Sequence, residues 1–289
     1  MSSMCRWWRQ FKLCTLSLEE LQEAVRVLEQ HHVPVLTPGD VQHIASQGTE
    51  RIGSGYYGSC VKVVHPDTQQ PLVIKTFSKF GNGLSDLVYE ATNLQYLRQV
   101  PGVQRLVGVC VQTRQMITHF RGTTAQHYFK RAAPSLADTF SVFWQISRTL
   151  QQVLDKGLAH NDIKADNVCI QADSDGPRAT IIDFGLADKV GNVLNYRKPS
   201  HPSHYPWLAP EVTRHTHPCG EASDVYSLAC LIKQSLPARS RPRQQPSLAP
   251  LRELVRRGKL ITPGKRPRLS EFTELLQQMY HEAASSADH

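Results

Sequence analysis

The hydrophobic pattern of the chain changes near residue 120, and this change limits the fold more than any other feature. From residue 49, short β-branched runs and turn signals predict one helix over residues 84–98 and strands at residues 51–52, 60–64, 72–77, 105–111 and 115–120. Beyond residue 120 the spacing is mainly helical, and its longest run covers residues 139–154. We therefore expect an α+β fold with a small β-rich lobe (49–120), a larger helical lobe (121–280), a cleft, and a tail (281–289).

A helical extension is expected before this domain, over residues 1–48. Apolar residues at helical spacing predict an amphipathic helix over residues 17–32, and Ser17 with Glu20 matches a capping box. Thr37-Pro38 predicts a second helix start, because Thr is a good N-cap and Pro suits the first helical position. We expect the extension to pack on the domain that follows, and a regulatory role is the alternative.

A glycine-rich segment, Gly53-Ser-Gly-Tyr-Tyr-Gly58, precedes the strand expected at residues 60–64. Glycines let a backbone approach phosphate oxygens and present N–H groups without a Cβ in the way. Taken alone, such a segment is more often a hairpin turn, and no helix follows it, as a dinucleotide-binding turn requires. The segment therefore predicts phosphate binding only in combination with other signals.

Two charged residues supply one such signal. Lys75 ends the apolar run Leu72-Val-Ile-Lys75, and Glu90 lies near the apolar face of the helix over residues 84–98. A lysine at the end of a strand is usually a surface residue, but behind a glycine-rich hairpin it becomes a candidate phosphate ligand. An inward-facing glutamate requires a partner, so we predict that Glu90 pairs with Lys75.

The strongest chemical signal lies between residues 160 and 211. It consists of His160-Asn-Asp-Ile-Lys-Ala-Asp-Asn167, then Asp183-Phe-Gly185, and finally Ala209-Pro-Glu211. Phosphoryl transfer requires a carboxylate that orients the attacking hydroxyl, oxygen ligands for Mg²⁺, and cations for the phosphates. Residues of these chemical types are present: Asp162, Lys164, Asn167 and Asp183.

In this order, the segments resemble the eukaryotic-type protein kinase family over about residues 49–280. The resemblance implies the two-lobed protein kinase fold, transfer of the ATP γ-phosphoryl group to protein hydroxyls, and ATP and Mg²⁺ as cofactors. By matching position it implies that Asp162 is the catalytic base, Lys164 contacts the γ-phosphate, and Asn167 and Asp183 bind Mg²⁺. It also implies phosphate contacts from Gly53, Gly55, Gly58 and Lys75, with Lys75 steadied by Glu90.

The resemblance implies further nucleotide contacts and two structural pairs. The side chains that enclose the nucleotide are Ile52, Val61, Val73, Thr118, Phe120 and Cys169. Thr118 takes the gatekeeper position, and His119-Phe120 forms the hinge. In the second lobe, Asp224 braces the catalytic loop and Arg266 pairs with Glu211.

Some positions depart from the family pattern. Asn161 stands where an arginine usually senses a phosphorylated activation segment, so we expect activity without that phosphate. Val73 replaces the usual alanine and narrows the adenine pocket. Lys164 is typical of serine/threonine kinases, whereas Trp207-Leu208 is closer to tyrosine kinases. Serine and threonine are the expected acceptors, and the alternatives are a tyrosine or dual-specificity kinase, a pseudokinase scaffold and a small-molecule kinase.

Composition indicates which partners and which cellular compartment to expect. The net charge is +8, and much of it lies in the basic stretch 239–268, which is most simply a solvated face and otherwise favours acidic partners. Nucleic-acid binding is not expected, because no recognisable binding module is present. The 7 cysteines are scattered without metal-site spacing, and no apolar run approaches a membrane span or a signal peptide. We expect an intracellular protein, cytoplasmic or nuclear.

Overall fold

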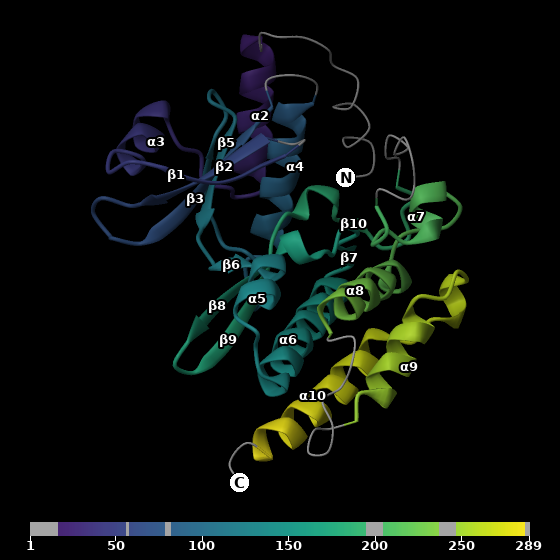
Figure 1. The fold of residues 1–289 in the computed structure, drawn as a ribbon. Helices are drawn as coiled ribbons and strands as arrows, with labels where there is room; N and C mark the ends of the chain where they lie inside the picture. The colour runs from purple at the N-terminus through teal and green to yellow at the C-terminus, as the bar shows by residue number, and fades with distance from the viewer. Residues whose placement is uncertain (1–16, 56–57, 79–81, 195–204, 237–246, 287–289) are drawn as a thin grey trace. The chain divides into compact units, whose positions relative to one another are not determined.

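The structure is a computed structural model that describes residues 17–55, 58–78, 82–194, 205–236 and 247–286 (Figure 1). The chain forms two compact units. Of the described residues, those up to 99 and 104–120 belong to the first unit, and 100–103 and those from 121 onward belong to the second. Each unit has its own sheet and helices, and each is described separately below.

The first unit is built on a five-stranded antiparallel sheet with the strand order β1-β2-β3-β5-β4. Its helix α4 (Gly83–Tyr96) packs against β3, β4 and β5. The β-branched runs of the sequence supply these strands, with ends within a few residues of the expected ones. The strands are β1 (Glu50–Gly55), β2 (Gly58–Val64), β3 (Pro71–Phe77), β4 (Leu106–Cys110) and β5 (Gln115–His119).

The two expected N-terminal helices are present, with the expected caps. They are α2 (Leu18–Gln30), which has the Ser17–Glu20 capping box, and α3 (Pro38–Ile44), which begins after the N-cap Thr37. Thr37 also forms a capping box, with Asp40. These residues do not form a separate body: α2 packs against α4, and the described residues before β1 belong to the first unit.

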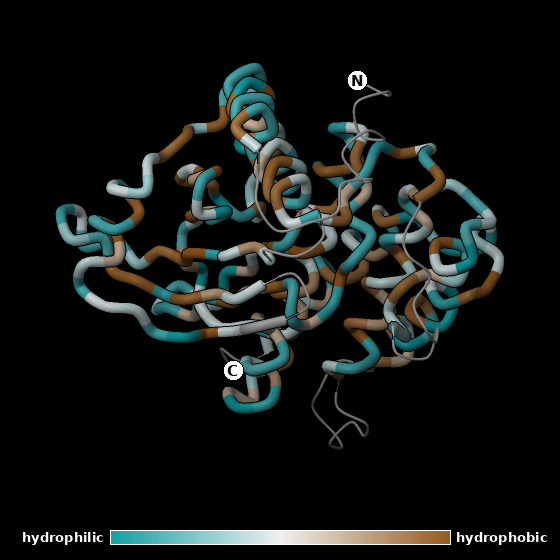
Figure 2. The backbone as a smooth tube through the Cα atoms, turned by 90° about the horizontal axis from the view of Figure 1, so that it is seen from above, coloured by the Kyte–Doolittle hydropathy of each residue, from teal (hydrophilic) through white to brown (hydrophobic). Residues whose placement is uncertain are grey.

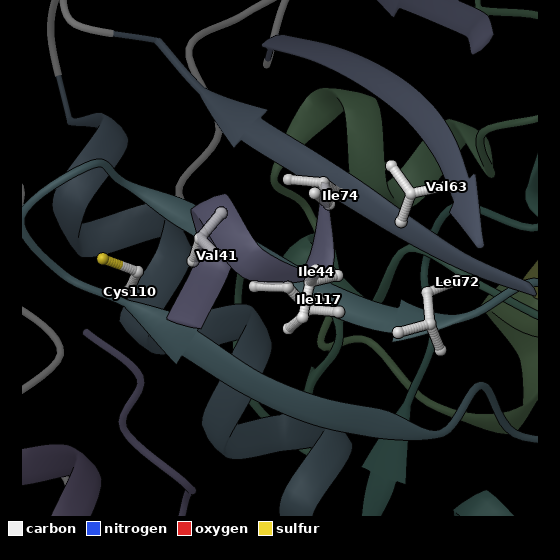
Figure 3. Close-up of a cluster of buried hydrophobic side chains, with 7 residues drawn as sticks. All are labelled: Val41, Ile44, Val63, Leu72, Ile74, Cys110 and Ile117. Carbon is white, nitrogen blue, oxygen red and sulfur yellow. The ribbon is translucent and has the colours of Figure 1, made fainter. Parts of the chain in front are cut away.

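The segment between α2 and α3 adds a short pairing to the edge of the sheet. The N–H of Val109 donates to the Pro34 carbonyl at 2.9 Å, and the N–H of Leu36 donates to the Val109 carbonyl at 2.7 Å. From there α3 covers one face of the sheet, where Val41 and Ile44 are buried with strand residues (Figure 3). These strand residues are Val63, Leu72, Ile74, Cys110 and Ile117. We call residues 18–45 the N-terminal clasp. They contact the first unit in three places: the edge of the sheet at β4, the sheet face under α3, and the helix α4.

The clasp gives a stability prediction. Leu28 on α2 is fully buried, whereas Leu18 at the start of the same helix is 71% exposed. Leu28→Ala should lower the free energy of unfolding by about 2–5 kcal/mol, because it removes buried apolar contacts and leaves a cavity. Leu18→Ala should change it by less than about 0.5 kcal/mol. Urea unfolding of both variants checks this, and equal losses would show that α2 does not pack as described.

The second unit is mainly helical. Its long helix α6 packs against α8 and α10, and these helices lie side by side in Figure 1. The helix α6 begins before the predicted residue 139, because Ser135 caps it by accepting from the N–H of Asp138 at 3.0 Å. The helices are α5 (Ala125–Arg131), α6 (Leu136–Asp155), α7 (Pro210–Arg214), α8 (Glu221–Ser235), α9 (Ala249–Gly258) and α10 (Leu269–Ser285).

Small sheets and short 3₁₀ turns carry the polar segments of the second unit. One sheet has the order β6-β8-β9, and β10 pairs with β7. The strands are β6 (Thr123–Thr124), β7 (Leu158–Ala159), β8 (Val168–Asp173), β9 (Gly176–Ile181) and β10 (Asp188–Lys189). The 3₁₀ turns are η2 (Ala165–Asn167), η3 (Phe184–Leu186) and η5 (Pro263–Lys265).

Hydrophobic and hydrophilic residues alternate along both units (Figure 2). Among the described residues, no helix combines the length and apolar character that crossing a membrane requires.

Candidate active site

The first unit holds the predicted ion pair. The Lys75 Nζ on β3 donates to the Glu90 carboxylate on α4 at 2.7 Å. The two side chains are 14% and 3% exposed, so the pair is largely shielded from water. A carboxylate this deeply buried requires such a partner. The pair therefore fixes α4 relative to β3 and holds the lysine ammonium in one place.

Two glycines of the glycine-rich segment differ in how closely other atoms surround them. At Gly58, where φ is +143°, an added Cβ would lie 1.9 Å from the Thr76 carbonyl oxygen, so the packing of β2 on β3 itself requires glycine. Among the described residues, no atom lies within 4 Å of a Cβ added at Gly53. A glycine at this position lets a ligand approach the backbone closely. Gly55 pairs with Gly58, and the tip at Tyr56-Tyr57 lies outside the described residues.

The strand register decides which side chains share a face with Lys75. Cys60 pairs directly with Lys75, and Val73 lies two residues before Lys75 on the same strand, so these three side chains point to one face. Val61 pairs with Ile74 and packs against the cluster under α3, on the opposite face. The expectation for Val61 is therefore corrected: Cys60 is the β2 side chain on the Lys75 face. A shift of one residue along a strand reverses the face.

The other expected nucleotide contacts of the first unit differ in exposure. Ile52 on β1 is 43% exposed, at an irregularity in its pairing with β2. Thr118 is buried and its hydroxyl accepts from the Gln104 amide at 2.8 Å. Phe120 has its backbone N–H bound to the Pro71 carbonyl at 3.0 Å, and the Lys62 Nζ lies 4.7 Å from its ring centroid. Phe120 can thus offer a ligand its ring but not its N–H group.

In the second unit, a single carboxylate gathers several donors. One oxygen of Asp162, Oδ2, accepts from the Lys164 Nζ at 2.7 Å and from the Asn167 Nδ2 at 2.8 Å. The other oxygen, Oδ1, accepts from the indole Nε1 of Trp207 at 2.7 Å. The sequence placed Asp162, Lys164 and Asn167 together, but treated Trp207 only as a sign of acceptor class. Its contact with Asp162 joins residues far apart in the sequence, and no local pattern signals it.

The backbone around Asp162 is held by two buried polar groups. The fully buried Asp224 on α8 accepts from the N–H groups of His160 and Asn161, each at 2.8 Å. Burial raises the pKa of Asp224, and the His160 side chain and these two N–H groups oppose the rise. The His160 Nδ1 in turn accepts from the N–H of Asp162 at 3.2 Å, and its Nε2 lies 3.2 Å from the Ile182 carbonyl. The bracing predicted for Asp224 is therefore present as direct hydrogen bonds.

Asn161 fills the place of the missing arginine with neutral hydrogen bonds. Its φ is +65°, a left-handed conformation that asparagine tolerates better than most residues. Its Nδ2 donates to the carbonyls of Ala159 at 3.0 Å and Leu186 at 3.2 Å. Its Oδ1 accepts from the Ser223 hydroxyl at 3.2 Å. The start of the segment after Asp183 is thus tied to the loop without a charge that needs a phosphate.

The two expected metal ligands have suitable chemistry. Asn167 uses its amide nitrogen in both of its bonds to Asp162, which leaves its oxygen, an atom type that Mg²⁺ prefers, for a ligand. Asp183 has a left-handed φ of +64° and precedes Phe184, which is fully buried against the His160 ring at 4.6 Å between centroids. Cys169, the remaining expected contact, lies on β8 opposite Thr124 and Thr180.

A second buried ion pair lies away from these residues. The Arg266 guanidinium binds both oxygens of Glu211 at 2.6 and 2.8 Å, as the resemblance implied. It also donates to the carbonyls of Leu260, Ala222 and Ile261. The two side chains are 0% and 3% exposed. This pair ties the start of α7 to the segment before α10.

The described part of the basic stretch is less basic than its sequence indicates. Arg266 pairs with Glu211, Arg256 pairs with Glu253, and Arg257 lies 3.2 Å from Glu271. Glu211 and Glu271 come from outside the stretch, so counting charges within it overlooked them. Residues 239–246 lie outside the described residues, and an acidic partner for this stretch stays a prediction.

A family model described as "Protein kinase domain" matches residues 46–286. The chain is similar to dual specificity testis-specific protein kinase 2 of Homo sapiens, with 28% identity over 188 residues that cover 63% of this chain and 32% of that protein. It is also similar to dual specificity testis-specific protein kinase 1 of Homo sapiens, with 28% identity over 192 residues that cover 63% and 30%.

A more distant relative is calcium-dependent protein kinase 5 of Plasmodium berghei (strain Anka), with 25% identity over 180 residues that cover 61% of this chain and 32% of that protein. The matched part thus spans about a third of the length of each of these relatives.

Proposed function

Because this chain belongs to the protein kinase family, we propose that it transfers the γ-phosphoryl group of Mg-ATP to serine and threonine hydroxyls of proteins. The observation that carries the proposal is the group around Asp162. A buried carboxylate lies 2.7 Å from a lysine ammonium, beside an asparagine amide. When a hydroxyl attacks an anionic phosphoryl group, a base must accept its proton and a nearby cation must offset the negative charge.

Each residue then has a role in the transfer. Asp162 orients the acceptor hydroxyl and takes its proton, while Lys164 offsets the negative charge that develops on the transferred group. Lys75, held by Glu90, binds the phosphates of the nucleotide, and the backbone at Gly53 lies over them. Asn167 and Asp183 would hold Mg²⁺, which when bound neutralises phosphate charge. The proposed nucleotide contacts of the first unit are Ile52, Cys60, Val73, Thr118 and Phe120, and that of the second unit is Cys169.

Serine and threonine are proposed as acceptors because Lys164 lies at the carboxylate itself. Tyrosine is the second candidate acceptor, for two reasons. Trp207 occupies a position typical of tyrosine kinases, and two of the relatives are named as dual-specificity kinases. A pseudokinase scaffold is less well supported, because Lys75, Glu90, Asp162, Asn167 and Asp183 are all retained.

The test is a transfer assay with the purified full-length chain. Labelled ATP, Mg²⁺ and three peptide pools are supplied, and the pools are identical except for a serine, a threonine or a tyrosine at the acceptor position. We expect labelled phosphoserine and phosphothreonine, with Asp162→Asn as the background control. Label only on tyrosine would reverse the acceptor class. Binding of ATP without transfer to any pool would favour the scaffold.

A further inference from the structure

The Trp207 indole makes a contact that the proposed roles leave unexplained. Its N–H donates to Oδ1 of Asp162 at 2.7 Å. The Lys164 Nζ, which binds the other oxygen of the same carboxylate, also lies 5.1 Å from the centroid of the indole ring. A cation at this distance from an indole is attracted to the ring. One side chain therefore touches both residues that the proposed function places at the reacting atoms.

Helix α8 binds the backbone of Trp207, and a neighbouring ring packs against its indole. The Ser227 hydroxyl on α8 donates to the Trp207 carbonyl at 2.7 Å, and the Tyr205 ring packs edge-on against the indole at 5.6 Å between centroids. The same helix carries Asp224, which binds the backbone of the loop before Asp162. The helix α8 thus positions the donor and the loop that bears its acceptor.

The hydrogen-bond donors around Asp162 leave one acceptor position on its carboxylate for a further donor. An ionised carboxylate offers about four acceptor positions, two on each oxygen. Among the described residues, Lys164 and Asn167 fill the two on Oδ2, and Trp207 fills one on Oδ1. The position that is left lies on Oδ1. Because the indole N–H restrains rotation of the carboxylate, it also fixes the direction of this last position.

We propose that Trp207 is a positioning residue for phosphoryl transfer, an inference that rests on the proposed function. It orients the Asp162 carboxylate so that Oδ1 receives the acceptor hydroxyl. In the transfer, the hydroxyl oxygen forms its bond to the γ-phosphorus as the bond from that phosphorus to the β,γ-bridging oxygen breaks. The hydroxyl proton passes to Oδ1, and ADP leaves with the bridging oxygen. A hydrogen bond to a charged acceptor is strong enough to affect this geometry.

Trp207→Phe tests the inference, because it removes the N–H while it keeps an aromatic ring beside Lys164. We expect kcat to fall by about 10- to 100-fold, the loss that corresponds to one hydrogen bond to a charged group. The KM for ATP should change little, because the lost N–H binds the Asp162 carboxylate and phenylalanine keeps an aromatic ring beside Lys164. If Trp207 instead blocked Oδ1 as a latch, kcat would rise, and that result overturns the proposal.

Trp144→Phe is the matched control. Trp144 also stacks on an aromatic ring, that of Tyr280 at 5.9 Å, and the Arg148 guanidinium lies 5.4 Å from its ring centroid. Its buried Nε1, however, has no hydrogen-bond partner among the described residues. Trp144→Phe should therefore leave kcat unchanged. The two variants remove the same atoms and differ in whether the lost N–H binds Asp162.

A double-mutant cycle separates positioning from a general structural role. In the Asp162→Asn background, Trp207→Phe should have no further effect, because the acceptor is already changed. An equal loss in both backgrounds, or no loss in either, overturns the proposal. If Trp207→Phe does not fold, Ser227→Ala releases the Trp207 carbonyl and should give a smaller loss with the same dependence on Asp162. The kcat of the wild-type protein tests whether phosphoryl transfer occurs at all. The ratio of kcat with and without Trp207→Phe, compared between the two backgrounds, tests the role of Trp207.

Discussion

Asp162→Asn is expected to lower kcat by about 10²- to 10⁴-fold, the range for loss of a positioned general base. The amide keeps the size of the carboxylate but has one oxygen fewer to accept protons. Its NH₂ group would also face donors, because Lys164, Asn167 and Trp207 all donate to this side chain. The KM for ATP should change little, because Asp162 is proposed to bind the acceptor hydroxyl and not the nucleotide.

Asp166→Asn is the control, because Asp166 is an exposed residue of the same loop. It changes the charge by the same amount and should leave kcat nearly unchanged. Single-turnover transfer to a peptide, with melting curves for both variants, checks the comparison. If Asp162→Asn is folded and fully active, Asp162 is not the base and the proposed mechanism is wrong.

Arg266→Met is expected to lower the free energy of unfolding by about 3–5 kcal/mol, the cost of leaving one member of a buried ion pair without its partner. Glu211 would keep its charge in a site that is 3% exposed. The backbone carbonyls of Leu260 and Ala222 would also lose their donor. Urea unfolding measures this change directly.

Two further variants show the origin of the loss. The double variant Arg266→Met with Glu211→Leu should recover part of the stability, because no buried charge is then left unpaired. Arg256→Met should leave the stability nearly unchanged, because water and salt screen the exposed pair that Arg256 forms with Glu253. If Arg266→Met and Arg256→Met were equally mild, burial would not determine the strength of these pairs.

The pairs that the sequence predicted are those that a motif fixes at both ends. Lys75 with Glu90 was expected from residue type and position, Arg266 with Glu211 was implied by the family resemblance, and both pairs are present. Helix starts at Ser17 and Thr37 followed from capping chemistry, which acts within a few residues. Such signals can be read from sequence because each partner is either local or one of a few candidates.

What the sequence did not predict depends on register and on the path of the chain. Val61 was assigned to the wrong face, because a one-residue error in aligning a strand reverses the side chain. The contact from Trp207 to Asp162 depends on how the segment before α7 is anchored on α8, and no periodicity encodes that path. The pairing of residues 34–36 with β4 was missed because a short stretch containing proline reads as a loop.

The N-terminal clasp has a practical consequence for anyone who produces part of this protein. The family match begins at residue 46, beyond the clasp. A recombinant fragment trimmed there would uncover the apolar face formed by Val63, Leu72 and Ile74, and would free the edge of β4 at Val109. Bare sheet edges and apolar faces drive chains to associate with one another. Such a fragment would precipitate even if its site residues kept their arrangement. An assay would then record a loss of activity that comes only from the loss of soluble protein.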